Sequence, residues 1–307
     1  MAGSALPLPP IELATRVGSL AGDSQLEQYE AIGASLKLAI LSSLPAGWDW
    51  KGRRALDFGC GAGRVLRHFV REAKSAEFWG CDIDAPSIEW LRDHACPPFR
   101  AFVVDERPGL PQEDEYFDVA WAMSVFTHLT ESWAGWLLEL HRVLKSDGYL
   151  IATFMGASMI GELLGESWDE DRTGMNVVGA GRPWSQGGPL VFHSEWWIRA
   201  HWGRGFDVAE LHSNADSPGT QGLVVLRKKP ARLTAVALDK PEPGEPRELA
   251  AARHNIEQLH GEDRRIREQL KHRADARARQ LVARLARRWS ARAHARARRT
   301  TSRESSR

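Results

Sequence analysis

The chain has 307 residues, of which 43% are hydrophobic and 26% are charged. This supplies a buried core for one large domain or two smaller ones, and it excludes a fibrous, collagenous or wholly disordered chain. The uncharged stretch 149–161 is shorter than the roughly 20 apolar residues that a membrane-spanning helix needs. The first basic residue is Arg16, and prolines stand where a signal peptide has its apolar stretch, so we expect a cytoplasmic protein.

The formal net charge of +1 hides two opposite parts. Residues 271–307 contain 13 Lys or Arg and two acidic residues, which gives this segment a charge of +11 and leaves −10 for residues 1–270. The three cysteines form no CxxC pair and have no nearby His at zinc spacing. We therefore expect neither a disulfide framework nor a bound metal.

The predicted elements alternate between apolar strands and amphipathic helices, which is typical of a parallel sheet in an α/β fold. A Pro-rich lead is followed by a helix over 25–44. The predicted strands are 55–58, 77–81, 101–104, 118–121, 149–154, 206–213 and 222–227. The predicted helices between them are 65–71, 86–94, 132–143 and one that Ser194 caps, whereas 156–192 is expected to be irregular.

By composition the chain divides into five segments. We predict an N-terminal segment over 1–50, a main domain over 51–229, a Pro-rich linker over 230–246, a long helix over 247–299 and a disordered tail over 300–307.

The most informative stretch lies between the first predicted strand and the next helix. Asp57 is followed there by Gly59, Gly61 and Gly63. A tight glycine turn lets a ligand approach the backbone, and amides at a helix start can hold an anionic group. A dinucleotide fingerprint would need glycine where Arg64 stands, so the spacing disfavours NAD.

A second carboxylate further restricts the class of ligand. Asp82 stands at the end of the next predicted strand, where it can accept hydrogen bonds from both hydroxyls of a ribose. The two features together favour a ribose-bearing cofactor without a pyrophosphate.

Four successive motifs resemble those of class I S-adenosylmethionine-dependent methyltransferases. They are Asp-Phe-Gly-Cys-Gly-Ala-Gly-Arg at 57–64, Gly-Cys-Asp-Ile-Asp at 80–84, Tyr-Phe-Asp-Val at 116–119 and His-Arg-Val-Leu-Lys-Ser-Asp-Gly at 141–148. The family commonly has Pro-Gly where this chain has Ser146-Asp147. The resemblance implies a Rossmann-like, doubly wound sheet of seven strands in the order 3-2-1-4-5-7-6, with strand 7 antiparallel, followed here by the long C-terminal helix.

The resemblance also implies S-adenosylmethionine as the cofactor, covered by the helix within 1–50. Asp57 would organise the amino group of the cofactor, Asp82 would hold the ribose and Ile83 would pack on the adenine. The other implied cofactor-binding residues are Gly59, Cys60, Gly61 and Gly63 at the methionine part, Asp105 at the adenine amino group and Ser124 after the fourth strand.

Methyl transfer to a hydroxyl requires a group that removes the hydroxyl proton. His128 follows the fourth predicted strand, and an unperturbed histidine has a pKa of about 6.5, which suits a base near neutral pH. We predict that His128 is the general base. The alternative is that it caps the following helix or packs beneath the cofactor, and His193 and Glu195 are further candidates for the base.

Residues 126–129 (Phe-Thr-His-Leu) and 219–228 resemble a subgroup of bacterial methyltransferases associated with polysaccharide and glycolipid assembly. Trp168 and Trp184 offer flat apolar faces that can stack on sugar rings, and with His193 they are predicted to bind the substrate. The alternative for the two tryptophans is simple anchoring of the loop.

The sequence thus predicts O-methylation of a sugar, glycan or glycolipid hydroxyl. The chain has neither the Asn/Asp-Pro-Pro-Tyr loop nor the nucleophilic cysteine that nucleic-acid base methyltransferases carry after the fourth strand. Two alternatives remain. One is O- or N-methylation of another small molecule, and the other is a non-catalytic, cofactor-binding scaffold that recruits partners through the C-terminal helix.

The C-terminal helix carries two surfaces. Over 247–270, large aliphatic residues stand at heptad-compatible positions that Asp263 interrupts, which favours a short coiled coil and a homo-oligomer. Over 277–299, arginines surround a narrow stripe of Leu281, Leu285 and Trp289. This pattern favours an anionic membrane surface, at about 1 kcal/mol per charge, because binding to nucleic acid would not need the apolar stripe. Nucleic acid and a protein partner remain alternatives.

Overall fold

The computed structural model describes residues 6–17, 20, 22–165, 167–183, 187–214, 216–217, 219–268, 270–272 and 277. Two compact units divide at Ala252, and each is described by itself. No helix among the described residues is both long and apolar enough to cross a membrane.

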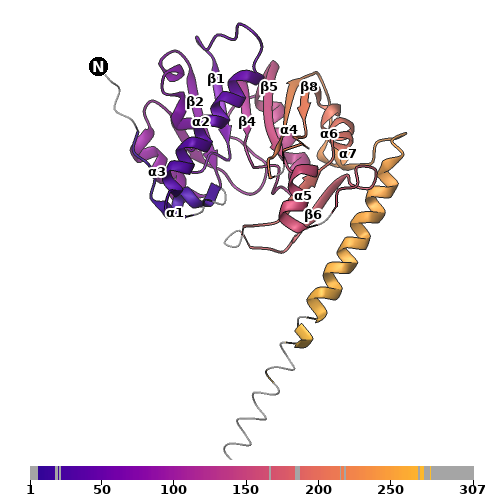
Figure 1. Cartoon of the computed structure of the whole chain (residues 1–307). Coiled ribbons are helices and arrows are strands. Elements are labelled where there is room, and N and C mark those ends of the chain that lie inside the picture. The colour runs from indigo at the N-terminus through magenta and orange to yellow at the C-terminus, as the bar shows by residue number, and fades with distance from the viewer. Residues whose placement is uncertain are drawn as a thin grey trace, which may run out of the picture. The chain divides into compact units, whose positions relative to one another are not determined.

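The first unit is built on a seven-stranded sheet with the order β3-β2-β1-β4-β5-β9-β8 (Figure 1). Its strands are β1 (Arg54–Phe58), β2 (Glu77–Asp82), β3 (Arg100–Val103), β4 (Phe117–Ala122), β5 (Leu144–Phe154), β8 (Phe206–His212) and β9 (Gly222–Lys228). All neighbours pair in parallel except β9, which is antiparallel to β5 and to β8. The predicted fold is confirmed, because β9 is the seventh strand of this sheet in chain order.

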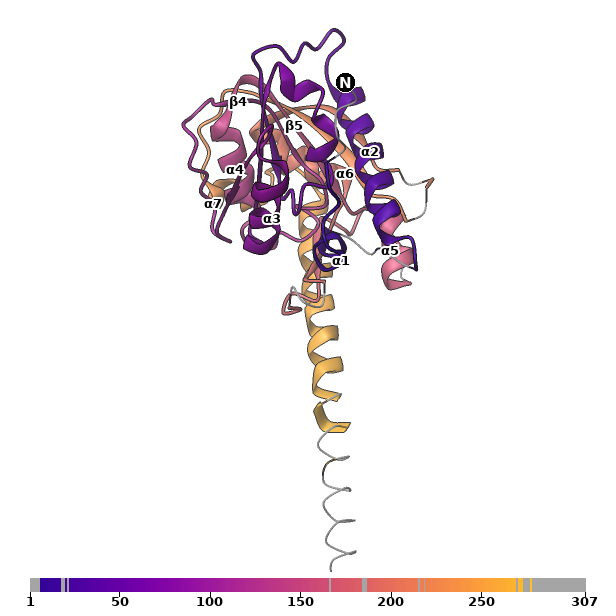
Figure 2. The same cartoon turned by 90° about the vertical axis from the view of Figure 1, so that its left-hand side faces the viewer.

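Helices cover both faces of the sheet. They are α1 (Ile11–Ala14), α2 (Gln25–Ser43), α3 (Ala85–Ala95), α4 (Trp133–Val143), α5 (Ala157–Leu164), α6 (Glu195–His201) and α7 (Ala235–Asp239), with 3-10 turns η1 (Thr15–Val17), η2 (Leu66–Phe69), η3 (Glu72–Lys74) and η5 (Trp202–Arg204). A further helix spans 247–268. Figure 2 shows α2 and α4 on opposite sides of the sheet.

Alternating residues of the central strands divide the core into two layers. Ala55 and Val119 pack with the cluster that contains residues of α2 and α3, whereas Leu56 and Ala120 pack with the cluster that contains residues of α4 and α6. β4 is buried along its whole length, as expected for a central parallel strand covered on both faces. The carboxyl ends of these strands form the edge at which the predicted ligand-binding residues lie.

Two local expectations were wrong. The helix predicted over 65–71 is only the short 3-10 turn η2, and the stretch 156–192 is not irregular. It contains α5 and the strands β6 (Met175–Val178) and β7 (Leu190–His193), which pair antiparallel in a second, two-stranded sheet. Short apolar runs form this hairpin, and its glycine-rich connection concealed it from a reading by composition.

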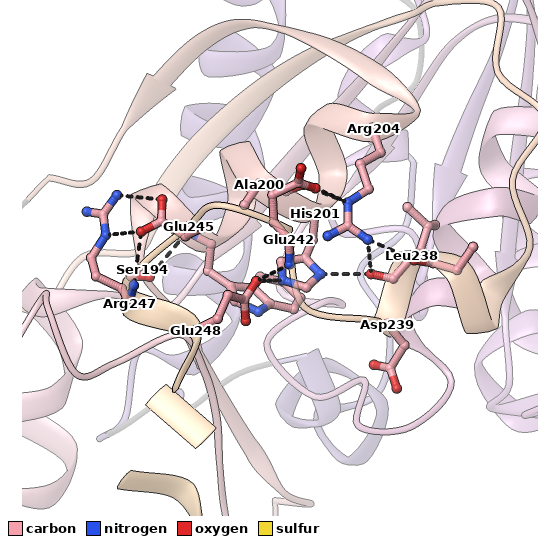
Figure 3. Close-up of polar contacts among 12 residues, drawn as sticks. Ser194, Ala200, His201, Arg204, Leu238, Asp239, Glu242, Glu245, Arg247 and Glu248 are labelled. Atoms are coloured by element: carbon pink, nitrogen blue, oxygen red, sulfur yellow. Dashed lines mark hydrogen bonds and ion pairs between the residues drawn. The ribbon is translucent and has the colours of Figure 1, made fainter. Parts of the chain in front are cut away.

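The stretch 230–246, expected as a linker, is attached to the first unit by polar contacts. It contains α7, whose last turn offers the Leu238 carbonyl to Nδ1 of the buried His201 at 2.7 Å. The His201 Nε2 lies 2.8 Å from a carboxylate oxygen of Glu248, in the first turn of the helix over 247–268 (Figure 3). Residues 230–252 are therefore part of the fold of the first unit.

Candidate functional site

The loop after β1 adopts a conformation that requires glycine. Gly59, Gly61 and Gly63 have φ angles of 76°, 52° and 81°, in the left-handed region that other residues rarely adopt. A Cβ atom on Gly59 would stand 2.4 Å from Cγ2 of Val125, and one on Gly63 would meet Leu91. The sequence pattern therefore sets how closely the loop packs against the turn after β4 and against α3.

The carboxyl group of Asp57 lies buried beneath this loop. Asp57 is 2% exposed, and its Oδ2 has no hydrogen-bond partner. Burial raises the pKa of Asp57 to about 7, although the nearby indole of Trp121 and the charge of Arg64 oppose the shift. A buried, unpartnered carboxylate oxygen is unfavourable by itself, and a cationic ligand group such as an ammonium would relieve it.

Asp82 joins the glycine loop to the end of β2. Its Oδ2 accepts a hydrogen bond from the Gly61 amide at 2.7 Å, and its Oδ1 accepts one from the Asp84 amide at 2.9 Å. Burial raises the pKa of Asp82. The carboxylate is thus held at the carboxyl edge of the sheet, beside the loop that starts at Gly59.

The two predicted adenine contacts lie at the same edge. Ile83 follows Asp82 and is 43% exposed, which is unusual for an isoleucine next to a buried strand. Asp105 is exposed and follows Val104, whose amide donates to the Asp82 carbonyl at 3.0 Å. The structure therefore brings the predicted ribose and adenine contacts together at the ends of β2 and β3.

The N-terminal segment is tied to both sides of the glycine loop. Arg16 in η1 forms an ion pair with Asp84, just after β2. On the other side, Arg67 donates to the carbonyls of Leu6 and Pro7 at 2.6 and 2.9 Å. Tyr29 of α2 is fully buried. These contacts hold the segment beside the glycine loop and the end of β2.

Ser124 links the carboxyl ends of β4 and β5 to the amino end of the neighbouring antiparallel strand β9. Its amide donates to Oγ1 of Thr153 on β5 at 2.7 Å, and its hydroxyl donates to the side-chain oxygen of Gln221, just before β9, at 3.2 Å. Its φ of 62° places it in a sharp turn directly after β4. Cys60, another predicted contact, is buried, and burial raises the pKa of its thiol well above the ordinary value.

His128 lies in the turn after β4, bonded to the segment that precedes β7. Its Nδ1 is 2.7 Å from the Pro189 carbonyl. A carbonyl can only accept, so Nδ1 carries a proton, and the lone pair of the neutral ring is on Nε2. Burial lowers the pKa of His128. This geometry suits a proton acceptor at Nε2, and it also anchors the turn.

A cavity of about 210 Å³ lies at the carboxyl end of β5. It is lined by Phe154, Gly156, Ala157, Trp168, Glu170, His193, Glu195 and Ser213. Two of the predicted substrate contacts, Trp168 and His193, meet in this cavity, together with the weaker base candidate Glu195. Trp184 lies outside the described residues. In Figure 1, α1, α5 and β6 lie along this same end of the sheet.

Sequence reasoning missed Glu170, which organises the cavity wall. Its Oε2 accepts from the indole of Trp168 at 2.6 Å, and its Oε1 accepts from the Glu195 amide at the start of α6 at 3.2 Å. Its backbone carbonyl accepts from the Trp196 indole at 2.8 Å. No sequence signal marks this role, because it depends on α6 folding back over the loop.

A larger hollow of about 510 Å³ lies elsewhere. Its lining includes Glu115, before β4, and Lys228, at the end of the antiparallel β9, so it lies at the amino edge of the parallel strands. Many of its charged groups pair with one another, as Arg142 does with Asp114 at 2.7 Å. Because the glycine loop lies at the opposite, carboxyl edge of the strands, this hollow is remote from it. Among the described residues, no cluster of three His, Cys, Asp or Glu side chains could hold a metal ion.

Comparison with known proteins agrees with this geometry. Residues 56–152 match the family model described as "Methyltransferase domain". The phthiotriol/phenolphthiotriol dimycocerosates methyltransferase 1 of Mycobacterium ulcerans is 27% identical over 145 residues, which are 47% of this chain and 49% of that protein. The fatty-acid O-methyltransferase of Mycolicibacterium smegmatis is 28% identical over 38% of this chain and 42% of its own length. The matched region thus spans about half the length of these relatives.

Among solved structures, the 1,6-didemethyltoxoflavin-N1-methyltransferase of Burkholderia thailandensis, crystallised with S-adenosylhomocysteine, has a TM-score of 0.45 at 15% identity. The match covers 66% of this chain and 80% of that one. Residues 56–152 are thus similar to a methyltransferase domain, and the strand order of the sheet is the one that the resemblance to class I S-adenosylmethionine-dependent methyltransferases implies.

Proposed function

We propose that this protein transfers a methyl group from S-adenosylmethionine to a hydroxyl of a sugar, glycan or glycolipid. The observation that carries the proposal is the placement of two sites on one edge of the sheet. Asp57 and Asp82 lie at the ends of β1 and β2, and the cavity with Trp168 and His193 lies at the end of β5. Only β4 separates β1 from β5 in the sheet.

The residues present fit the cofactor. The buried, unpartnered oxygen of Asp57 suits an ammonium group, and the exposed face of Ile83 suits an adenine ring. Asp82 stands ready to accept hydrogen bonds from a ribose. S-adenosylmethionine, when bound, would supply a methyl group on a positively charged sulfur. The sulfur is a leaving group that needs no acid.

The chain's own residues then have two tasks, which are to align the acceptor and to remove its proton. We assign proton removal to Nε2 of His128, because the Pro189 carbonyl holds the proton on Nδ1. The acceptor hydroxyl would lose its proton to this nitrogen as its oxygen bonds to the methyl carbon. Trp168 and His193 would hold the acceptor on the neighbouring side of the edge.

The names of these two relatives support an acceptor with a lipid part. One relative is named for phthiotriol dimycocerosates and another for fatty acids. A glycolipid agrees both with these names and with the Phe-Thr-His-Leu motif at 126–129. The alternatives stay a small-molecule O- or N-methyltransferase and a non-catalytic scaffold.

The test is methyl transfer from methyl-labelled S-adenosylmethionine to a glycolipid fraction. Replacing His128 by alanine should lower turnover by about a hundredfold or more, with little change in cofactor affinity, if His128 is the base. The matched control is His94→Ala on α3, because His94 is exposed and its ring stacks on Trp90. Equal turnover by the His128 variant would remove it from the mechanism, and absence of transfer by the native chain would contradict the proposed activity.

We also propose a cytoplasmic protein whose C-terminal region associates with other surfaces. The described helix would join a second copy of the chain through 247–270. The basic stripe over 277–299 lies, apart from Arg277, outside the described residues, and it would bind the anionic inner face of a membrane. Failure to float with anionic liposomes at low salt would contradict the membrane proposal.

A further inference from the structure

The cavity beside the proposed methyl-transfer site has walls that are largely aromatic or aliphatic. Phe154 and Ala157 come from the end of β5 and from α5, and Trp168 closes the cavity from the following loop. At about 210 Å³ it is smaller than the roughly 300–1,000 Å³ of pockets that enclose a whole drug-sized ligand. It can therefore hold one end of a larger molecule.

His193 is a further residue of the lining, and it carries a buried imidazole. The residue is fully buried, and neither ring nitrogen has a hydrogen-bond partner. Its ring lies among those of Trp197 and Trp202, with centroids 5.2 and 5.6 Å away. Burial, and then the charge of His201, lower the pKa of His193 to about 3, so the ring is neutral at physiological pH. A neutral imidazole offers one donor and one acceptor, which matches a hydroxyl group.

The charged groups of the lining are both acidic. Glu170 is fixed by Trp168 and by the amide of Glu195, and Glu195 is itself a lining residue of the cavity. Among the lining residues that the structure describes there is no Lys or Arg. Arg247 acts on Glu170 from outside the lining, but its guanidinium is paired with Glu245 at 2.7 and 2.9 Å (Figure 3).

From these contacts we propose that the cavity receives an uncharged hydroxyl group carried on an apolar chain or ring, and that it rejects carboxylates and phosphates. The proposal rests on the proposed function, because it places the acceptor of that reaction here. It separates methylation of an alcohol from methylation of a carboxylic acid. An anionic acceptor would meet the like charges of Glu170 and Glu195, with no Lys or Arg among the described residues of the lining.

The test is binding, so that it does not depend on turnover. Calorimetry on the full chain compares decanol with decanoate, which differ in the charge of the end group and share one chain length. Decanol should bind at least about tenfold more tightly than decanoate. The double variant Glu170→Gln, Glu195→Gln should bring the two affinities within about threefold of each other, whereas the control Glu210→Gln, exposed on β8, should leave the ratio unchanged.

A second variant tests the polar group. His193→Phe should weaken the binding of decanol by about tenfold while leaving the unfolding temperature within a few degrees, because a phenyl ring fills the same buried space. The proposal is overturned by equal or tighter binding of decanoate, or by a ratio that the double glutamine variant does not change. Loss of methyl transfer with this binding preference intact would instead contradict the proposed function alone.

Discussion

Asp57 has an electrostatically unfavourable environment. Its carboxyl group is buried, and Oδ2 has no partner within the protein. Such an arrangement lowers stability while the site holds only protein groups, and ligand binding sites commonly accept this kind of local penalty. We interpret the buried carboxyl as the group that makes the site selective for a cation.

The elevated pKa of Asp57 predicts a specific pH dependence of stability. Burial raises the pKa from 3.8 to about 7, so the folded chain keeps this proton to a higher pH than the unfolded chain does. The stabilising contribution is complete below about pH 4 and is lost as pH rises through about 7. Between pH 5 and pH 8, the unfolding free energy of the native chain should fall by about 2 kcal/mol relative to Asp57→Asn.

Urea denaturation at a series of pH values measures this difference. The control is Asp93→Asn, an exposed aspartate on α3, for which the difference from the native chain should stay constant. A constant difference for Asp57→Asn as well would show that the buried carboxyl does not titrate in this range.

The glycine loop shows how a short element depends on both backbone conformation and packing. Gly59 has a positive φ, and its Cα faces Val125 at a distance that leaves no room for a methyl group. Gly52 has a similar φ of 72°, but no atom lies within 4 Å of the place where a Cβ would stand. A comparison of Gly52 with Gly59 therefore separates the effect of backbone strain from that of steric exclusion.

Alanine at each position should give different losses of stability. Gly52→Ala should cost about 1 kcal/mol, because only the strained φ is involved. Gly59→Ala should cost at least about 1 kcal/mol more, since Val125 must also move, and it should weaken cofactor binding. Denaturant midpoints measure both losses. Equal losses for the two variants would mean that Val125 gives way freely.

The sequence allowed prediction of the elements that follow strong local rules. Alternating apolar runs and the four motifs predicted all seven strands of the main sheet and their order. Ser194 was predicted as a helix cap, and its hydroxyl does accept from the Trp197 amide. The hairpin of β6 and β7 was missed because it depends on pairing across a glycine-rich connection. The short α7 was missed although Thr234, which caps it, offered a local signal.

The polar contacts of α6 predict where the chain can be shortened. His201 contacts the carbonyl of Leu238 and the carboxylate of Glu248, and Ala251 is buried. A chain that ends after Pro246 should lose roughly 5 °C or more in unfolding temperature, because it removes Glu248 and Ala251. One that ends after Ala252 should unfold near the native temperature. Calorimetric scans compare them, and equal unfolding temperatures would contradict this role of the segment.

At the level of the whole chain, the acidic first unit and the basic C-terminal region have opposite charge, and between them runs a helix with an apolar stripe. Ile256, Leu259, Ile266 and Leu270 are each between 53% and 59% exposed. Their spacing alternates between three and four residues once Asp263 is counted, as in a heptad seam. In that register Glu262 and Arg267 fall at positions that face each other across a parallel pair of helices.

The helix therefore predicts a dimer formed by two parallel copies. Light scattering on the full chain as it elutes from a size-exclusion column should give twice the mass of one chain. The double variant Leu259→Arg, Ile266→Arg should give the mass of one chain. Leu38→Arg is the control, because Leu38 is 65% exposed on α2, outside the helix. A single mass for the native chain at micromolar concentration would contradict the coiled coil.

We expect the edge formed by the carboxyl ends of β1 and β2 to bind S-adenosylmethionine. Calorimetric titration of the full chain with S-adenosylhomocysteine measures this binding. Saturable binding at one site per chain is expected, with a loss of at least about tenfold in affinity for Asp82→Ala, whose carboxylate would otherwise hold the ribose. Absence of binding by the native chain, or unchanged affinity in the Asp82 variant, would contradict it.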